Sequence, residues 1–258
     1  MIVTALNHNS ENADGASLFD AIVEKHRAVA DEYRLVTQPD HARLSGAFAA
    51  ALDRERFPGI TDETVQAISE HDIGWLPLDG AAPKPVLPPF EQDGRLRSFL
   101  TTPPKVFLQA WTGSIANAEK IGPTAGTMVS RHFEGLAKFR LQRSQDSAED
   151  VTRLNYFLAQ ESARQHRLGA EGSSTDLLPI LQFCDLISLC ICCDVDGTSK
   201  FPMDFGEGAV HLTRSNGVAG LHGVPLRFAV AAECPAYRWR PGSPSLVPVP
   251  IKVYVECR

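Results

Sequence analysis

The sequence lacks the patterns that identify several common classes of protein. Its six cysteines do not supply the two C-x-x-C pairs of a zinc ribbon, so a structural zinc site of that kind is not indicated. No uninterrupted apolar run reaches the ~20 residues that span a membrane. The richest run, at 177–193, is interrupted by Asp185 and contains Pro179. The N-terminal residues show no basic segment followed by an apolar run, which argues against a signal peptide. We therefore expect a cytoplasmic protein.

Basic residues are outnumbered by acidic ones. The chain has 25 Lys and Arg against 31 Asp and Glu, a formal net charge of −6, which argues against nucleic acid as an obligate partner. The same composition, 43% hydrophobic and 22% charged over 258 residues, is typical of a globular protein with one large domain or a domain plus an appendage. No membrane partner is expected, and the oligomeric state is left open, a homodimer included.

Helical periodicity dominates the chain up to Cys193, and short strand-like segments follow from 198 onward. We expect an N-terminal tail and helix in 1–34, a helical metal-binding core in 35–193, and a β-rich appendage in 194–258 packed on that core. The predicted fold class is therefore mainly α, a helical bundle with a small C-terminal antiparallel β appendage.

The tract 74–104 has no regular periodicity and holds seven of the 18 prolines. A loop of this length inside a compact protein is usually functional or mobile. Because it follows directly on a candidate metal-binding pair, we interpret it as a wall or lid, with Trp75, Phe90 and Phe99 as apolar contacts for a ligand. Packing of these aromatic side chains in the core is the alternative interpretation.

Two segments place histidine on the apolar side of a helix. Thr37 is a suitable N-cap for a helix with Pro39 in its first turn, and His41 lies one turn into that helix on its apolar face. His71 falls three residues after the inward position Ile68, at the end of the next helix. A buried histidine can also be a satisfied core residue, so neither position alone establishes a ligand.

His71 is followed immediately by Asp72 in the string SEHDIGW. Adjacent residues point about 100° apart in mid-helix, but at a fraying helix end the backbone can turn both side chains toward one cation. An imidazole nitrogen and a carboxylate oxygen are both plausible ligands for a transition metal. The alternative is a histidine at a helix C-cap beside a solvated aspartate.

Asp185 is the single charge in the segment 177–193. A helix this apolar must be buried nearly all round, and an ionised carboxylate there is costly unless it is paired or binds a metal. A salt bridge to Arg or Lys and a neutral, hydrogen-bonded aspartic acid stay open as alternatives. His132 lies on a third apolar stripe, with Arg131 beside it as a candidate contact for an anionic group.

His41, His71, Asp72 and Asp185 thus place two imidazoles and two carboxylates in a helical core, and one divalent cation would satisfy all four. The ordered pattern H…HD…D on successive helices resembles the HD-domain superfamily of metal-dependent phosphohydrolases, over roughly residues 35–193. The strings TQPDHARLSG, AISEHDIGW, VSRHFEGL and LLPILQFCDLISLCICC are also similar to a bacterial HD-like family of unknown function.

This resemblance implies that these four residues are the metal ligands and that the fold is an HD-like helical bundle. The cofactor would be a divalent transition metal (Mn, Fe, Ni, Co or Zn), one per chain, with a weak second site near His132 left open. Members with two metals usually supply further histidines, and here only His132 is suitably placed. The acid or base that usually follows the pair is not evident either, because only Asp79 precedes Lys84.

The resemblance implies a metal-dependent hydrolase acting on a phosphate ester or related small anionic substrate, for example a nucleotide, through a metal-activated water. In this hypothesis His132 positions or protonates the leaving group, Arg131 offsets phosphate charge, and Gln38 and Trp75 belong to the second shell or pocket wall. The alternatives are an HD-type iron oxygenase, a non-catalytic module that binds metal or ligand, and a purely structural helical protein.

Overall fold

The structure is a computed structural model that describes residues 1–6, 18–143, 146–169, 173–195, 197–206, 208–215 and 218–257. Within these residues, helices take up 50% of the chain and strands 22%. The helices are α1 (Leu18–Arg27), α2 (Gln38–Ala51), α3 (Asp62–Ser69), the short 3₁₀ helix η1 (Ile73–Trp75), α4 (Leu76–Asp79), α5 (Pro104–Ile121), α6 (Pro123–Arg143), α7 (Ala148–Leu168) and α8 (Ser173–Cys192).

The described strands form sheets of four, five and two strands, in the orders β1-β2-β9-β10, β5-β6-β7-β11-β8 and β3-β4. The strands are β1 (Ile2–Ala5), β2 (Tyr33–Val36), β3 (Gly80–Ala81), β4 (Lys84–Pro85), β5 (Gly197–Asp204), β6 (Ala209–Ser215), β7 (Val218–His222), β8 (Val230–Cys234), β9 (Tyr237–Trp239), β10 (Val247–Pro248) and β11 (Ile251–Cys257).

These sheets show that the predicted fold class, mainly α with a small antiparallel appendage, was wrong. The segment 1–34 supplies β1 and the first residues of β2, which pair with each other and, through β2, with β9 near the other end of the chain. The C-terminal sheet is large and mixed, because β11 runs parallel to β7. Four-residue strands are too short for an alternating pattern to be recognised, and a partner some 200 residues away leaves no local signal.

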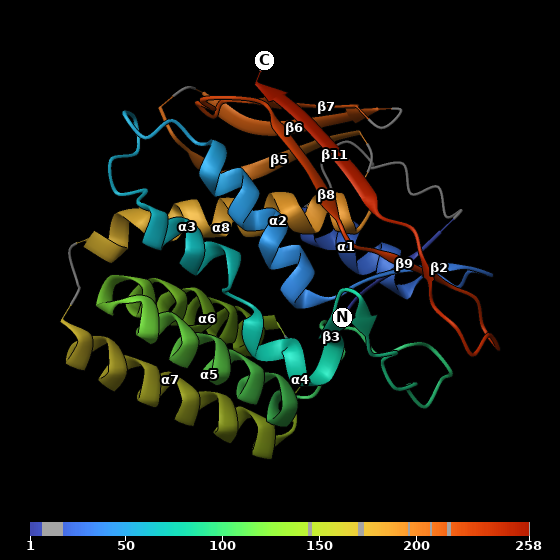
Figure 1. Cartoon of the computed structure of the whole chain (residues 1–258). Coiled ribbons are helices and arrows are strands. Elements are labelled where there is room, and N and C mark those ends of the chain that lie inside the picture. Colours follow the sequence, from blue (N-terminus) through green and yellow to red (C-terminus); the bar gives the residue numbers. More distant parts are fainter. Residues whose placement is uncertain are drawn as a thin grey trace.

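The elements are arranged in layers (Figure 1). The five-stranded sheet lies over α2 and α8, and α5, α6 and α7 lie on the other side of α8. The isolated bridge between Leu52 and Leu226 ties the end of α2 to the loop before β8. The helical core and the C-terminal sheet therefore share an extensive boundary.

One hydrophobic cluster draws on all three segments of the chain. It includes Ile22 of α1, Phe48 of α2, Leu181 of α8 and Leu212 of β6, each no more than 3% exposed. A second, smaller cluster joins β1, β2 and β9. The described cysteines 184, 190, 192, 193 and 234 are buried free thiols, as expected for small apolar core residues.

The sequences of α2 and α8, which carry candidate ligands, explain where α2 begins and why α8 is buried. Thr37 caps α2, and its side-chain oxygen accepts a hydrogen bond from the backbone nitrogen of Asp40 at 3.1 Å. The middle of α8 is packed between α2, α6 and β5, which is why nearly every residue from Leu177 to Cys193 is apolar. No helix in the described ranges is both long and apolar enough to cross a membrane.

Candidate metal centre

Four side chains from three distant segments converge between α2, α3 and α8. His41, His71 and Asp185 each offer one potential ligand atom, and these three atoms all lie within 4.8 Å of one another. Asp72 Oδ2 lies 3.1 Å from His41 Nε2 and 3.6 Å from His71 Nε2, and Asp185 Oδ1 lies 3.5 Å and 3.4 Å from the same two nitrogens. All four residues are buried. The spacing is suited to a cation between the two carboxylates and the two Nε2 atoms.

The geometry of His71 leaves one ring nitrogen available. Its Nδ1 lies 2.7 Å from the backbone oxygen of Ile68, so Nδ1 carries the proton that is donated there. The buried Nε2 faces Asp185 and Asp72 at 3.4 Å and 3.6 Å but forms no hydrogen bond of good geometry with any described residue. A buried polar atom without a partner is unusual in a native protein, and a cation would satisfy it.

A serine orients the ring of His41. His41 Nδ1 lies 2.6 Å from Ser188 Oγ, and this hydroxyl donates its own proton to the backbone oxygen of Asp185 at 2.9 Å. The hydroxyl therefore accepts from Nδ1–H, and Nε2 of His41 faces the two carboxylates. Ser45 Oγ lies 2.8 Å from Ser188 Oγ and closes the network. A partner of this kind fixes the tautomer of a metal-binding histidine.

The charges of the cluster partly offset one another. Burial lowers the pKa of His71, but the neighbouring carboxylates of Asp72 and Asp185 outweigh it and raise that pKa to about 9. Burial would raise the pKa of Asp185, but the surrounding histidines hold it at about 2. At pH 7 a proton on His71 thus offsets part of the negative charge, and a cation would replace this proton.

His132 lies at the edge of the cluster. Its Nε2 is 3.8 Å from Asp185 Oδ2, and its Nδ1 is buried without a partner among the described residues. Burial lowers its pKa to about 4, and the positive charge on His71 adds to this effect. His132 is therefore neutral at pH 7, which suits a metal ligand or a hydrogen-bonding group better than a proton donor to a leaving group.

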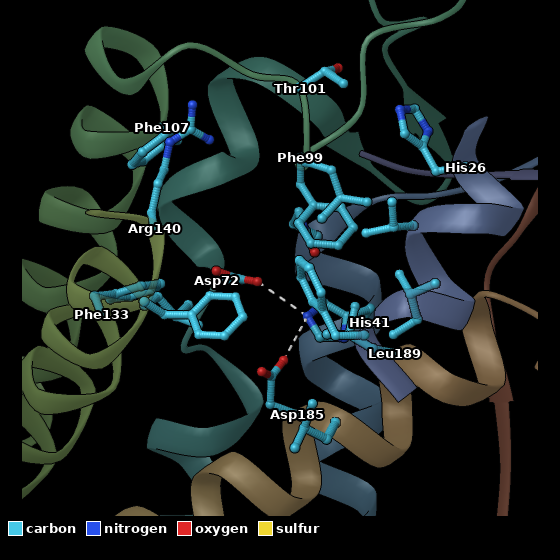
Figure 2. A pocket seen from close by; sticks show the side chains of 18 of the residues that line it. His26, His41, Asp72, Phe99, Thr101, Phe107, Phe133, Arg140, Asp185 and Leu189 are labelled. Carbon is cyan, nitrogen blue, oxygen red and sulfur yellow. Dashed lines mark hydrogen bonds and ion pairs between the residues drawn. The ribbon is translucent and has the colours of Figure 1, made fainter. Parts of the chain in front are cut away.

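The cluster faces a cavity of about 670 Å³. Figure 2 shows Asp185, His41 and Asp72 at one end, with Thr101 and His26 toward the other. Gln38, Trp75 and His132 also line the cavity, whereas His71 is not among its described lining residues. Phe99, Leu100 and Thr101 of the proline-rich tract line it too, as expected for a wall.

The walls are mainly apolar. Thirteen of the 25 described lining residues have aliphatic or aromatic side chains. They are Phe19, Ile22, Val23, Trp75, Phe99, Leu100, Phe107, Trp111, Phe133, Leu136, Phe139, Leu186 and Leu189. The ring of Trp111 packs against Phe107 and Phe133, with centroids 4.4 Å and 5.1 Å away, so one wall is a continuous aromatic surface.

Arg131, a predicted site residue, and Asp79, which the sequence only noted behind the His-Asp pair, are not among the described lining residues of the cavity. The positive charge of Arg131 helps to lower the pKa of Glu134. Asp79 is buried and forms an ion pair with the amino group of Met1. It also accepts a hydrogen bond from the backbone nitrogen of Gln38 at 3.0 Å, so it is committed to the fold.

Sequence reasoning missed the arginines and the serine. Arg27, Arg95, Arg140 and Arg143 line the cavity. Arg140 and Arg143 follow His132 by eight and eleven residues on α6, a spacing that returns to a similar helix face. Ser188 follows Asp185 by three residues on α8 for the same reason. Arg140, Arg143 and Ser188 could therefore have been found in the sequence from their helical spacing to His132 and Asp185.

Comparison with known proteins gives one family. The family model described as "Protein of unknown function (DUF3891)" matches residues 25–222. Neither the search of curated proteins nor the search of solved structures produced a match.

Proposed function

The chain belongs to the DUF3891 family of proteins of unknown function, and we propose that it is a metal-dependent hydrolase of phosphate esters or related small anionic substrates. The observation that carries the proposal is the buried group of His41, His71 and Asp185 beside a cavity. Its order along the chain, with Asp72 after His71, supports a further proposal that the helical core is related to the HD-domain superfamily.

In this proposal His41, His71, Asp72 and Asp185 hold one divalent transition metal. When bound, such a cation polarises a phosphoryl oxygen and lowers the pKa of a water molecule. His71 reaches its binding state by losing the proton on Nε2. Ser188 keeps the Nε2 of His41 turned toward the carboxylates.

His132 and Gln38 would position the substrate. The neutral ring of His132 lines the cavity and has a buried Nδ1 without a partner among the described residues, so it can hydrogen-bond an ester oxygen or a water. Gln38 likewise has a side-chain oxygen without a described partner. Because His132 is neutral at pH 7, the proposal assigns it orientation and not protonation of the leaving group.

Activity after metal loading tests the proposal. Metal-stripped protein is incubated with Mn²⁺, Zn²⁺, Co²⁺, Ni²⁺ or Fe²⁺ and offered phosphomonoesters, phosphodiesters and nucleotides. Metal-dependent release of phosphate or alcohol, lost on substitution of Asp185 by asparagine, is expected. Tight metal binding without turnover of any member of the panel would instead favour a non-catalytic ligand-binding module.

A second candidate is an iron oxygenase. Two imidazoles and one carboxylate are the donor set of non-haem iron oxygenases, and His41, His71 and Asp185 supply that set beside a mainly apolar cavity. Anaerobic reconstitution with Fe²⁺ followed by measurement of oxygen uptake separates the two functions. Oxygen consumption coupled to loss of an organic substrate, without hydrolysis, would favour the oxygenase.

A further inference from the structure

We propose that the substrate is an amphiphile, an anionic ester whose alcohol part is a bulky alkyl or aryl group. This inference rests on the proposed function for the position of the reacting bond, at the cluster of His41, Asp72 and Asp185. Its own basis is the surface that leads from the cluster to the mouth of the cavity.

The deep walls next to the cluster are aromatic and aliphatic. Phe107, Trp111 and Phe133 form the aromatic wall and are already almost fully buried. Phe99, Leu186 and Leu189 also line the cavity and are only partly buried, so they offer apolar surface to a ligand group. Leu189 lines the opposite side, near His41 (Figure 2). Surface of this kind contributes binding energy through the hydrophobic effect and offers little to a sugar or a free phosphate.

The mouth is also apolar, and an arginine lies over its aromatic rings. Phe19, Leu136 and Phe139 line the cavity with 37%, 38% and 36% of their surface exposed. The guanidinium of Arg143 lies 5.8 Å and 4.7 Å from the ring centres of Phe19 and Phe139. A tail that leaves the deep cavity would cover these side chains. The described lining has four arginines, Arg143 included, against three aspartates, Asp20, Asp72 and Asp185, and this balance together with the bound cation favours an anionic ligand.

Few polar side chains are present to recognise a nucleobase or a sugar. Apart from the ligand cluster and the charged residues, Gln38, Thr101, His26 and His132 are the polar residues in the described lining. His26 Nε2 is engaged with Ser98 Oγ at 3.2 Å. A nucleotide would leave many of its hydrogen-bonding groups unpaired against apolar walls, which costs affinity. The lining therefore favours an alkyl or aryl ester.

The test compares ligands that cannot be hydrolysed at a P–O–C bond. Methylphosphonate, octylphosphonate and octyltrimethylammonium, each below its micelle concentration, are titrated into Mn²⁺-loaded protein by calorimetry. Each buried methylene strengthens binding about fourfold, so octylphosphonate is expected to bind at least about 100-fold more tightly than methylphosphonate. The cationic amphiphile should bind at least about 10-fold more weakly than octylphosphonate, because Arg143 and the cation both repel it.

A pair of leucine variants locates the tail. Leu136→Asn should weaken octylphosphonate at least fivefold and leave methylphosphonate unchanged. Leu76→Asn is the matched control, because Leu76 is 44% exposed and lies outside the described lining. Leu136 is itself partly exposed, so its variant should fold.

The outcomes separate this inference from the proposed function. Equal affinities for methyl- and octylphosphonate, an equally tight cationic amphiphile, or equal effects of the two leucine variants would overturn the inference. If octylphosphonate binds as expected but no phosphate ester is hydrolysed with any metal, the hydrolase proposal fails and the amphiphile site stands. If octyl phosphate and methyl phosphate are hydrolysed with the same kcat/KM, the hydrolase stands and the inference fails.

Discussion

At the scale of single residues, the tautomer of each histidine decides whether a metal ligand is available. His41 and His71 each commit Nδ1 to a partner, Ser188 Oγ in one case and the backbone oxygen of Ile68 in the other. Both Nε2 atoms consequently face Asp72 and Asp185. The hydrogen bond that each Nδ1 makes on the side away from the carboxylates therefore orients Nε2 for metal binding.

Removing the hydroxyl of Ser188 tests this point. Ser188→Ala should weaken metal binding about 10-fold, because the loss of such an outer partner typically costs 10–100-fold. Calorimetric titration with Mn²⁺ or Zn²⁺ measures the change. Ser130→Ala is the control, since Ser130 is also buried but bonds Glu161 at 2.8 Å on the other side of α6. Equal affinities for the two variants would contradict the assigned role.

The pH dependence of metal binding follows from the raised pKa of His71. With this pKa at about 9, Nε2 is protonated at pH 7 and the cation must displace the proton. Metal affinity should therefore rise about tenfold per pH unit between about pH 6 and 8.5 and level off above about pH 9. The pKa values of Asp185, about 2, and His132, about 4, lie below this pH range, so neither group adds to the pH dependence of the affinity. An affinity that does not change with pH in this range would show that His71 is not a ligand.

Site residues could be predicted from the sequence where a charged or polar side chain falls in a segment that must be buried. Asp185 was identifiable because a lone carboxylate in an apolar helix needs a partner. His41 and His71 were identifiable from helical spacing, and the three residues do lie together. Arg131 was chosen as a neighbour of His132 in sequence, but adjacent helical residues point about 100° apart, and the cavity arginines on α6 are Arg140 and Arg143.

At the scale of elements, the His71-Asp72 turn depends on its close approach to α5. A Cβ on Gly74 would lie 1.9 Å from the backbone oxygen of Ala110 and 2.6 Å from the backbone nitrogen of Ser114. The backbone nitrogen of Gly74 also donates to Ser114 Oγ at 3.0 Å. Backbone atoms cannot move aside as a side-chain end can, so glycine is required here.

Gly74→Ala should therefore destabilise the protein and disturb the metal site together. We expect a loss of about 2 kcal/mol or more in the free energy of unfolding, with weaker metal binding because Asp72 is displaced. Urea denaturation and calorimetry measure the two effects. Gly135→Ala on α6 is the control, since the nearest atom to its Cβ would be 3.9 Å away. If Gly74→Ala matched this control in both measurements, α5 would not constrain the turn.

Helices were predictable as elements because their signals are local. Thr37, Pro39 and the spacing of apolar residues defined the start and the face of α2. Strands such as β1 and β2 were not assigned to a sheet because their definition depends on partners elsewhere in the chain. The pairing of β2 with β9 could not be read from the sequence, because the two strands are about 200 residues apart.

At the scale of the whole molecule, the C-terminal sheet is part of the structure that holds the cluster. It covers α2 and α8, the helices that carry His41 and Asp185 (Figure 1). The backbone nitrogen of Arg227 donates to Ala51 at 2.8 Å, and that of Asp53 to Pro225 at 3.0 Å. Sheet and helices therefore support one another.

A truncated chain of residues 1–195 should consequently lose cooperative folding. Removing the sheet would expose the buried side chains of α2 and α8 that it covers. Circular dichroism during thermal unfolding and binding of the dye ANS report the effect. We expect a broad transition and strong dye binding, and metal binding should be lost as well. A truncated chain with a sharp transition and full metal affinity would show that the helical core folds independently.

The proposed chemistry of this protein depends on one cation held between His41, His71, Asp72 and Asp185. The most direct measurement is the metal content of stripped protein after dialysis against Mn²⁺ or Zn²⁺, by elemental analysis. We predict about one ion per chain for the unmodified protein and for Asp93→Asn, an exposed carboxylate control, and almost none for His71→Ala or Asp185→Asn. A folded, unmodified chain that takes up no metal, or variants that retain the full load, would contradict it.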